Sequence, residues 1–173
     1  MFNKRSFCFW KLLKNRKGFT LTEALVVIGV LAIMITISVP SYISYLPKHR
    51  LQTSARQIYD DLQLAKIRAV KDNTDACITF DIVNENYTVF LDADGSSSWT
   101  AGDTMIKNTV TLENGVDMTA ANACGFNNRG LRTTAQTQVV RLTNPTGLIM
   151  RIDVNTAGGI SILMSKDNGV TWS

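Results

Sequence analysis

The chain has 173 residues, with 18 Lys and Arg, 14 Asp and Glu, one His and three Cys. This length accommodates one modest domain with an appendage and excludes a large multidomain enzyme. A pI of about 9.1 would favour an anionic partner such as a nucleic acid. However, residues 1–18 contain six of the 18 basic residues and no acidic one, which leaves 12 basic against 14 acidic side chains in the rest. The excess positive charge therefore belongs to the N-terminal segment.

A long apolar segment follows the basic one. Residues 24–39 carry no charge, and residues 19–46 carry a single one, on Glu23. A helix needs about 20 mostly apolar residues to span a bilayer, so this segment is long enough when its flanks are included. Basic flanks stay in the cytoplasm, so we expect the N-terminus inside and the rest across the membrane. A secretory signal peptide is disfavoured because the apolar run is too long and residues 38–42 match its cleavage site poorly.

The residues around Glu23 form a specific motif. The heptapeptide KGFTLTE, residues 17–23, between a basic leader and an apolar helix, resembles the processing site of type IV prepilins and type II secretion pseudopilins. The resemblance implies that a prepilin peptidase cleaves between Gly18 and Phe19 and methylates the new N-terminus of Phe19. It also implies an assembly role for Glu23, since a carboxylate in an apolar segment is tolerable when an amine, such as that of a neighbouring subunit, pairs with it.

The helix is expected to continue beyond the membrane. Pro40 and Pro47 should each kink or locally melt it. Beyond them an apolar stripe recurs at steps of three and four residues, which predicts an amphipathic helix packed on a head. Most charged residues of this stretch, Asp60 and Asp61 among them, are expected off the stripe. The stripe consists of Leu51, Ala55, Ile58, Leu62, Ala65 and Ala69.

Residues 72–173 have a different texture, with β-branched runs separated by Asn, Asp and Gly. Strands are predicted over residues 76–81, 87–91, 104–112, 138–143, 148–154 and 160–165. These strands are expected to form an antiparallel sheet, half-buried against the amphipathic helix. The expected fold class is therefore α+β, and the resemblance makes it a type IV pilin-like fold. Four parts are expected: a removed leader at 1–18, a transmembrane or filament-core helix at 19–46, its amphipathic continuation at 47–71, and a β-rich head at 72–173.

Three sequence stretches, of which the first begins in the predicted helix and the other two lie in the head, resemble one group within this family. Residues 62–80, 87–106 and 124–130 (LQLAKIRAVKDNTDACITF, YTVFLDADGSSSWTAGDTMI and CGFNNRG) are similar to the minor pilins and minor pseudopilins related to type II secretion protein H (GspH) and FimT. This similarity implies a structural subunit of a type II secretion pseudopilus or type IV pilus. The implied partners are a prepilin peptidase, other pilins and an inner-membrane assembly platform, and the head is expected in the periplasm before assembly. A DNA-binding minor pilin that takes part in DNA uptake is the alternative.

A polar loop in the head contains three acidic residues. Asp92, Asp94 and Asp103 are spaced like ligands of a calcium loop, but Gly95 is misplaced for one and a strand rather than a helix precedes the loop. A polar hairpin loop is favoured, with calcium binding as the alternative. No other cofactor or metal is expected.

Two cysteines remain once the leader, which contains Cys8, is removed. Cys77 and Cys124 would lie outside the cytoplasm, where disulfides persist, so a bridge between them is favoured. Two separately buried thiols are the alternative.

Four arginines could form a basic stripe for DNA: Arg129 and Arg132, with Arg141 and Arg151 on later strands. Solvated strand faces are favoured, because the chain after residue 18 is slightly acidic. With a single His, a zinc site or a Ser-His-Asp triad has no support, so no enzymatic activity is expected.

Overall fold

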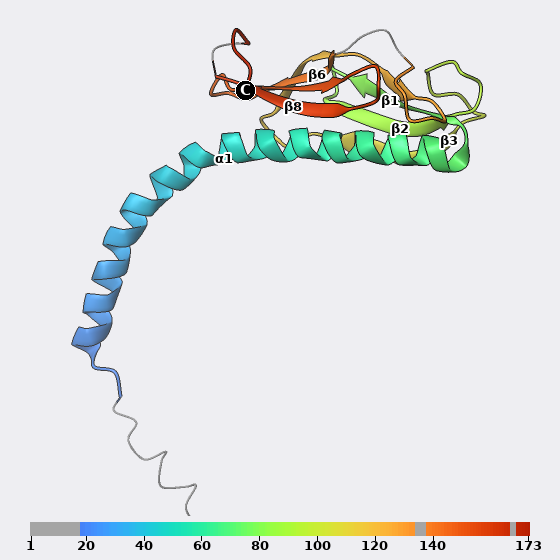
Figure 1. Cartoon of the computed structure of the whole chain (residues 1–173). Helices are drawn as coiled ribbons and strands as arrows, with labels where there is room; N and C mark the ends of the chain where they lie inside the picture. The colour runs from blue at the N-terminus through green and yellow to red at the C-terminus, as the bar shows by residue number, and fades with distance from the viewer. Residues whose placement is uncertain (1–17, 134–137, 167–168) are drawn as a thin grey trace, which may run out of the picture. The chain divides into compact units, whose positions relative to one another are not determined.

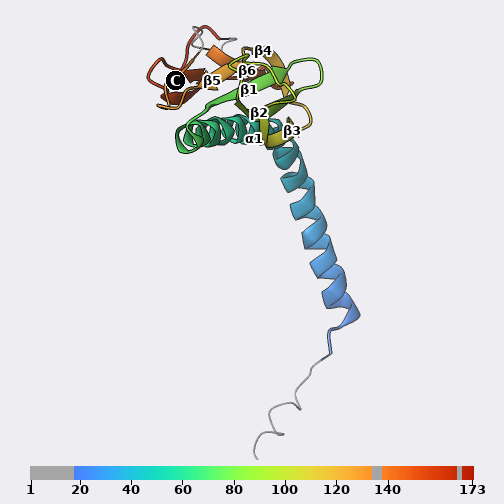
Figure 2. The ribbon, with the colours of Figure 1, turned by 90° about the vertical axis from the view of Figure 1, so that its right-hand side faces the viewer.

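The computed structural model describes residues 18–133, 138–166 and 169–173. Chain contacts divide it into two compact units, Met1–Tyr42 and Ile43–Ser173. The first unit contains the exposed first half of a helix, and the second contains the rest of that helix and all the strands. Figures 1 and 2 show the helix and the strands of the head.

The helix α1 runs over Leu21–Asp72, 52 residues without interruption. Both Pro40 and Pro47 lie inside it, so the local melting predicted at these residues is not seen, and kinks there stay a prediction. Its C-terminal end is closed by Asn73 in a left-handed conformation (φ 51°) and by a hydrogen bond from Thr74 N to Ala69 O of 3.2 Å. Asn tolerates this conformation better than most residues, and the backbone bond satisfies a carbonyl that the helix leaves unpaired.

The strands form two four-stranded antiparallel sheets rather than the one sheet predicted. Sheet A has the order β3-β2-β1-β5 and sheet B the order β4-β6-β7-β8. The strands are β1 (Asp75–Asp81), β2 (Asn86–Asp92), β3 (Thr104–Thr111), β4 (Asp117–Ala121), β5 (Cys124–Phe126), β6 (Gln138–Thr143), β7 (Ile149–Val154) and β8 (Ile160–Ser165). The six predicted strands are confirmed to within a residue or so at each end, whereas β4 and β5 were not predicted.

The head has one continuous core, to which the helix and both sheets contribute. All six stripe residues of α1 are completely buried, as the periodicity predicts. They meet inward residues of sheet A, such as Ile78 and Val89, and of sheet B, such as Leu142 and Ile152. The second half of α1 lies along one side of the two sheets (Figures 1 and 2). Burial of this apolar stripe fixes which face of the helix remains outside.

Candidate functional site

Gly18 and Phe19 precede the helix and are both exposed. Phe19 is 74% exposed, and a Cβ added at Gly18 would meet no atom within 4 Å. The peptide bond between them is therefore outside regular structure and open to a second protein. This is the bond at which the resemblance implies cleavage.

Thr20 begins the helix by capping it. Its Oγ1 accepts a hydrogen bond from Glu23 N at 3.2 Å, and its carbonyl accepts the first helical bond, from Ala24 N at 3.1 Å. A Thr followed three residues later by Glu is the sequence signature of a helix N-terminus. Sequence reasoning missed this cap, although the T-x-x-E pattern could have revealed it. Glu23 consequently lies in the first turn, where the helix dipole favours a carboxylate.

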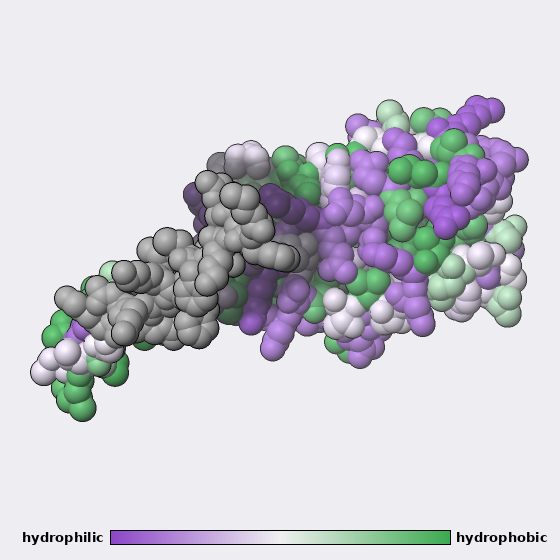
Figure 3. All heavy atoms as spheres, turned by 90° about the horizontal axis from the view of Figure 1, so that it is seen from below, coloured by the Kyte–Doolittle hydropathy of each residue, from purple (hydrophilic) through white to green (hydrophobic). Residues whose placement is uncertain are grey.

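The first half of α1 is apolar and unburied. The most apolar 18-residue stretch of α1 has a mean hydropathy of 2.4, and none of its residues is buried. The helix is therefore long and apolar enough to cross a membrane. The hydroxyls of Thr36 and Ser38 donate back to the carbonyls of Ala32 and Met34, at 2.8 and 2.9 Å. These polar groups therefore need no water when the helix lies in lipid. Hydrophobic residues gather at the N-terminal end of the described helix in Figure 3, whereas the head surface in that view is mixed.

Asp61 is a buried charge that the stripe prediction placed wrongly. Its side chain turns inward from α1, and the residue is 3% exposed. It accepts hydrogen bonds of 2.7 Å from the Tyr87 hydroxyl and from Lys107 Nζ. Burial and the neighbouring Asp61 carboxylate raise the pKa of Tyr87, so this phenol stays a donor. These three residues, named the Asp61 network, tie the helix to sheet A.

An open hollow of about 450 Å³ lies beside the Asp61 network. Its lining comes from one face of α1 and from β3, and every lining residue has a polar side chain. The lining residues are Thr53, Arg56, Gln57, Asp60, Asp61 and Lys107. The hollow contains both signs of charge, so its composition favours no one class of ligand.

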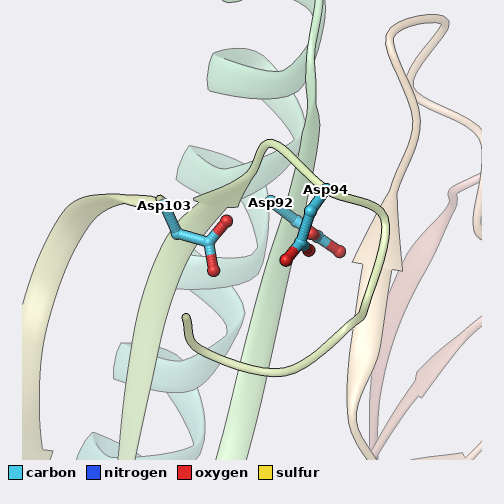
Figure 4. Close-up of side chains that lie close together, drawn as sticks. All are labelled: Asp92, Asp94 and Asp103. Carbon is cyan, nitrogen blue, oxygen red and sulfur yellow. The ribbon is translucent and has the colours of Figure 1, made fainter. Parts of the chain in front are cut away.

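Asp92, Asp94 and Asp103, named the three-aspartate cluster, do come together. One oxygen from each lies within 4.8 Å of the others (Figure 4). Each carboxylate already accepts backbone N–H groups of the loop: Asp92 from Ser97 at 2.8 Å, Asp94 from Ser96 at 2.9 Å, and Asp103 from Thr100 at 2.7 Å. Hydrogen bonds from the side chain and then the backbone of Ser96 lower the pKa of Asp94. The backbone bonds to the three carboxylates hold the loop closed. The contacts fit the favoured hairpin interpretation, and calcium binding stays a prediction.

The predicted disulfide is wrong in this structure, because Cys77 and Cys124 are both free and buried. Cys77 pairs with Gly125 across the two strands, and Ile78 pairs with Cys124. Opposite residues of an antiparallel pair share a face and successive residues alternate, so the two thiols point to opposite faces of sheet A. Cys124 enters the core, whereas Cys77 Sγ donates to Asp92 Oδ2 at 3.5 Å.

The four arginines do not form a free basic stripe. Arg132 is half-buried, and its guanidinium donates to the carbonyl of Val154. Arg141 and Arg151 lie under the ring of Trp172, at 5.8 and 4.2 Å from its centroid. Arg129 alone among the four is exposed, on the turn after β5.

Two family profiles match the sequence. The profile of type II transport protein GspH matches residues 54–158, and the prokaryotic N-terminal methylation motif matches residues 13–39. The first match covers most of the buried half of α1 and most of the head, and the second covers the processing motif and the apolar part of the helix. No curated protein sequence matches significantly.

Two solved structures have a similar fold. The type IV minor pilin FimU of Pseudomonas aeruginosa aligns at 18% identity and a TM-score of 0.51, over 65% of this chain and 91% of that one. The minor pseudopilin EpsH from the type 2 secretion system of Vibrio cholerae aligns at 16% identity and a TM-score of 0.51, over 66% and 96%. At these identities the likeness shows the fold, which confirms the predicted pilin-like α+β architecture.

Proposed function

Since this chain belongs to the family of type II transport protein GspH, we propose that it is a minor pseudopilin or minor pilin, a membrane-anchored structural subunit of a pseudopilus or pilus. One observation carries the proposal: the methylation motif matches the segment that includes the Gly18–Phe19 bond, Glu23 and the unburied apolar helix. An N-terminal helix with no partner in its own chain is suited to packing first among lipids and then among like helices.

Processing would convert the precursor into the subunit. A prepilin peptidase would cut the exposed bond after Gly18, remove the basic leader and methylate Phe19. The leader's six basic residues would hold that bond at the cytoplasmic face, with the head on the other side of the membrane. The charge that gives the whole chain its high pI would then be absent from the working subunit.

Assembly would depend on Glu23. Among the described residues no cation lies within ion-pair distance of its carboxylate. In an apolar helix bundle an unpaired carboxylate is costly, so the terminal amine of a neighbouring subunit is its natural partner. Pairing of this kind would set the axial register of one helix against the next.

A role in DNA uptake has no support from the family or from the similar structures. Arg132 donates to the Val154 carbonyl, and Arg141 and Arg151 lie under Trp172, so these arginines do not line up as one exposed basic stripe. Enzymatic activity is not part of the proposal, because the family and the similar folds are those of structural subunits. An inner-membrane assembly platform is the further partner that a filament subunit would need.

Processing can be tested with two glycines that differ only in position. Gly18→Leu should block cleavage, because the peptidase must approach a backbone that lacks a Cβ. Gly29→Leu is the control, since a Cβ at Gly29 also meets no atom within 4 Å. Intact-mass measurement of chains co-expressed with a prepilin peptidase should show loss of residues 1–18 and one added methyl group in the wild type and in Gly29→Leu. Equal processing of Gly18→Leu would refute the proposed cleavage site.

A further inference from the structure

Two arginines lie directly opposite each other on the outer face of sheet B. Arg141 of β6 pairs in register with Arg151 of β7. Their sequence neighbours Leu142 and Ile152 are completely buried, so the two guanidinium side chains leave from the face away from the core. Like charges directly opposite destabilise an antiparallel pair, so this arrangement needs a compensating group.

The C-terminal residues cover this pair. Ser173 and Met164 exchange two backbone hydrogen bonds, of 3.0 and 3.1 Å, so the tail extends sheet B beyond β8. The ring of Trp172 then lies 4.2 Å from the Arg151 guanidinium carbon and 5.8 Å from that of Arg141. Contact with an aromatic face fixes the guanidinium planes and leaves their in-plane N–H groups available.

The hydrogen bonds of this pair are incomplete. Arg151 makes an ion pair of 2.9 Å with Asp153, and among the described residues no acceptor reaches the Arg141 guanidinium. The Nε atoms of both arginines are buried without a partner, and so is Asp153 Oδ1. Buried polar groups are normally satisfied, so an orphaned donor on each arginine calls for an explanation. Among the described side chains of this cluster, two guanidinium groups face one carboxylate, that of Asp153, which leaves one net positive charge.

We propose that Arg141 and Arg151, under Trp172, bind one oxyanion, a carboxylate or a phosphate. Guanidinium groups match the geometry of both, and charge-assisted hydrogen bonds to them are among the stronger ones in proteins. The anion would satisfy the free Arg141 donors and relieve the repulsion between the two arginines. This site is separate from the processing segment and does not rest on the proposed filament function.

Trp172 provides a probe inside the site. The chain has three tryptophans, so replacing Trp10 and Trp99 by Phe leaves Trp172 as the sole tryptophan, whose emission can be excited selectively over that of tyrosine. The full chain in a nonionic detergent would be titrated with inorganic phosphate, and separately with acetate, at constant ionic strength set by chloride. We expect a saturable change in Trp172 emission with at least one anion. The anion with the higher apparent affinity in these titrations shows whether the site prefers phosphate or carboxylate.

The arginine variants decide whether the response belongs to this site. Arg141→Gln should weaken the apparent affinity more than about tenfold, because it removes a charged hydrogen-bond donor. Arg141→Lys keeps the charge but not the planar guanidinium, so its apparent affinity should lie between those of the wild type and Arg141→Gln. Arg56→Gln, on the exposed face of α1, should respond like the wild type. Circular dichroism would verify that each variant is folded.

A change in emission that is absent, that does not saturate, or that persists undiminished in Arg141→Gln would overturn the proposal. Thermal melting gives a second measurement. Phosphate or acetate should raise the melting temperature of the wild type relative to chloride, and this rise should vanish in Arg141→Gln. An equal rise in both proteins would also count against the site.

Discussion

The Asp61 network predicts a rescue of one mutation by another. Lys107→Met removes the cation that faces a carboxylate with only 3% exposure. Loss of the partner of a fully buried charge costs about 3–5 kcal/mol. The Lys107 side chain is 40% exposed, so solvent already screens the pair. We therefore expect Lys107→Met to lower the free energy of unfolding by a smaller amount, about 1–3 kcal/mol.

Asp61→Asn should then restore part of the stability that Lys107→Met removes. The Asn oxygen can still accept the hydrogen bond from Tyr87, at 2.7 Å in the wild type, but it carries no charge that needs Lys107. The double variant should therefore be more stable than Lys107→Met alone. Tyr87→Phe, which deletes a hydrogen bond to a charged group, should cost about 1.5–3 kcal/mol by itself.

The measurement is urea denaturation of the full chain in detergent, with equal m-values required before free energies are compared. Lys166→Met, a substitution at an exposed lysine of the head, controls for the loss of a positive charge. The reasoning fails if Lys107→Met costs as much in the Asp61→Asn background as in the wild type, since the two residues would then not be coupled.

Three further predictions concern the head. Burial raises the pKa of Cys77 and of Cys124 from about 9 to about 12. Both thiols should therefore resist labelling at pH 8 until the chain unfolds, and the stability they confer should be complete below pH 9 and decline as the pH rises toward 12. Cys77→Ser should show a shallower alkaline decline in the urea midpoint. Gly158→Ala should cost more than about 2 kcal/mol, because its Cβ would lie 2.0 Å from Gly130 O, whereas Gly147→Ala, with a similar positive φ and open space, should cost about 1 kcal/mol. If the three-aspartate cluster is only part of a hairpin loop, the protein should have the same melting temperature in calcium chloride as in magnesium chloride. A rise specific to calcium would contradict this interpretation.

The helix and most strands were predictable because their signals are periodic. Every stripe residue from Leu51 to Ala69 recurs at helical spacing, and each is completely buried. The missed strands give no such signal: β5, Cys124–Phe126, is three residues long and contains a glycine, and β4, Asp117–Ala121, contains two alanines. Their pairing is decided by partners distant in the sequence, which local propensity does not encode.

Asp61 and the two cysteines were misassigned for a related reason. Because Asp61 is charged, an exposed position is predicted for it. Hydrogen bonds from Tyr87 and Lys107 of sheet A offset the cost of burying its carboxylate. The expected location of the head outside the cytoplasm predicts a disulfide. However, the register between β1 and β5 pairs Cys77 with Gly125, which puts the two thiols on opposite faces of sheet A. Both outcomes depend on strand register, and an offset of one residue would reverse them.

The two carboxylates that matter most on α1 differ in where their partners lie. Asp61 is satisfied within the chain, by Tyr87 and Lys107, and it fastens the helix to the head. The Glu23 carboxylate has no cation partner among the described residues. The backbone N–H of Glu23 donates to Thr20 Oγ1, which caps the helix. A charged carboxylate without a cation on an exposed apolar helix is costly in lipid, and under the proposed function the amine of another chain would offset that cost. The same helix thus has one charge that is paired within the head and one that, under the proposed function, would pair with a neighbouring subunit.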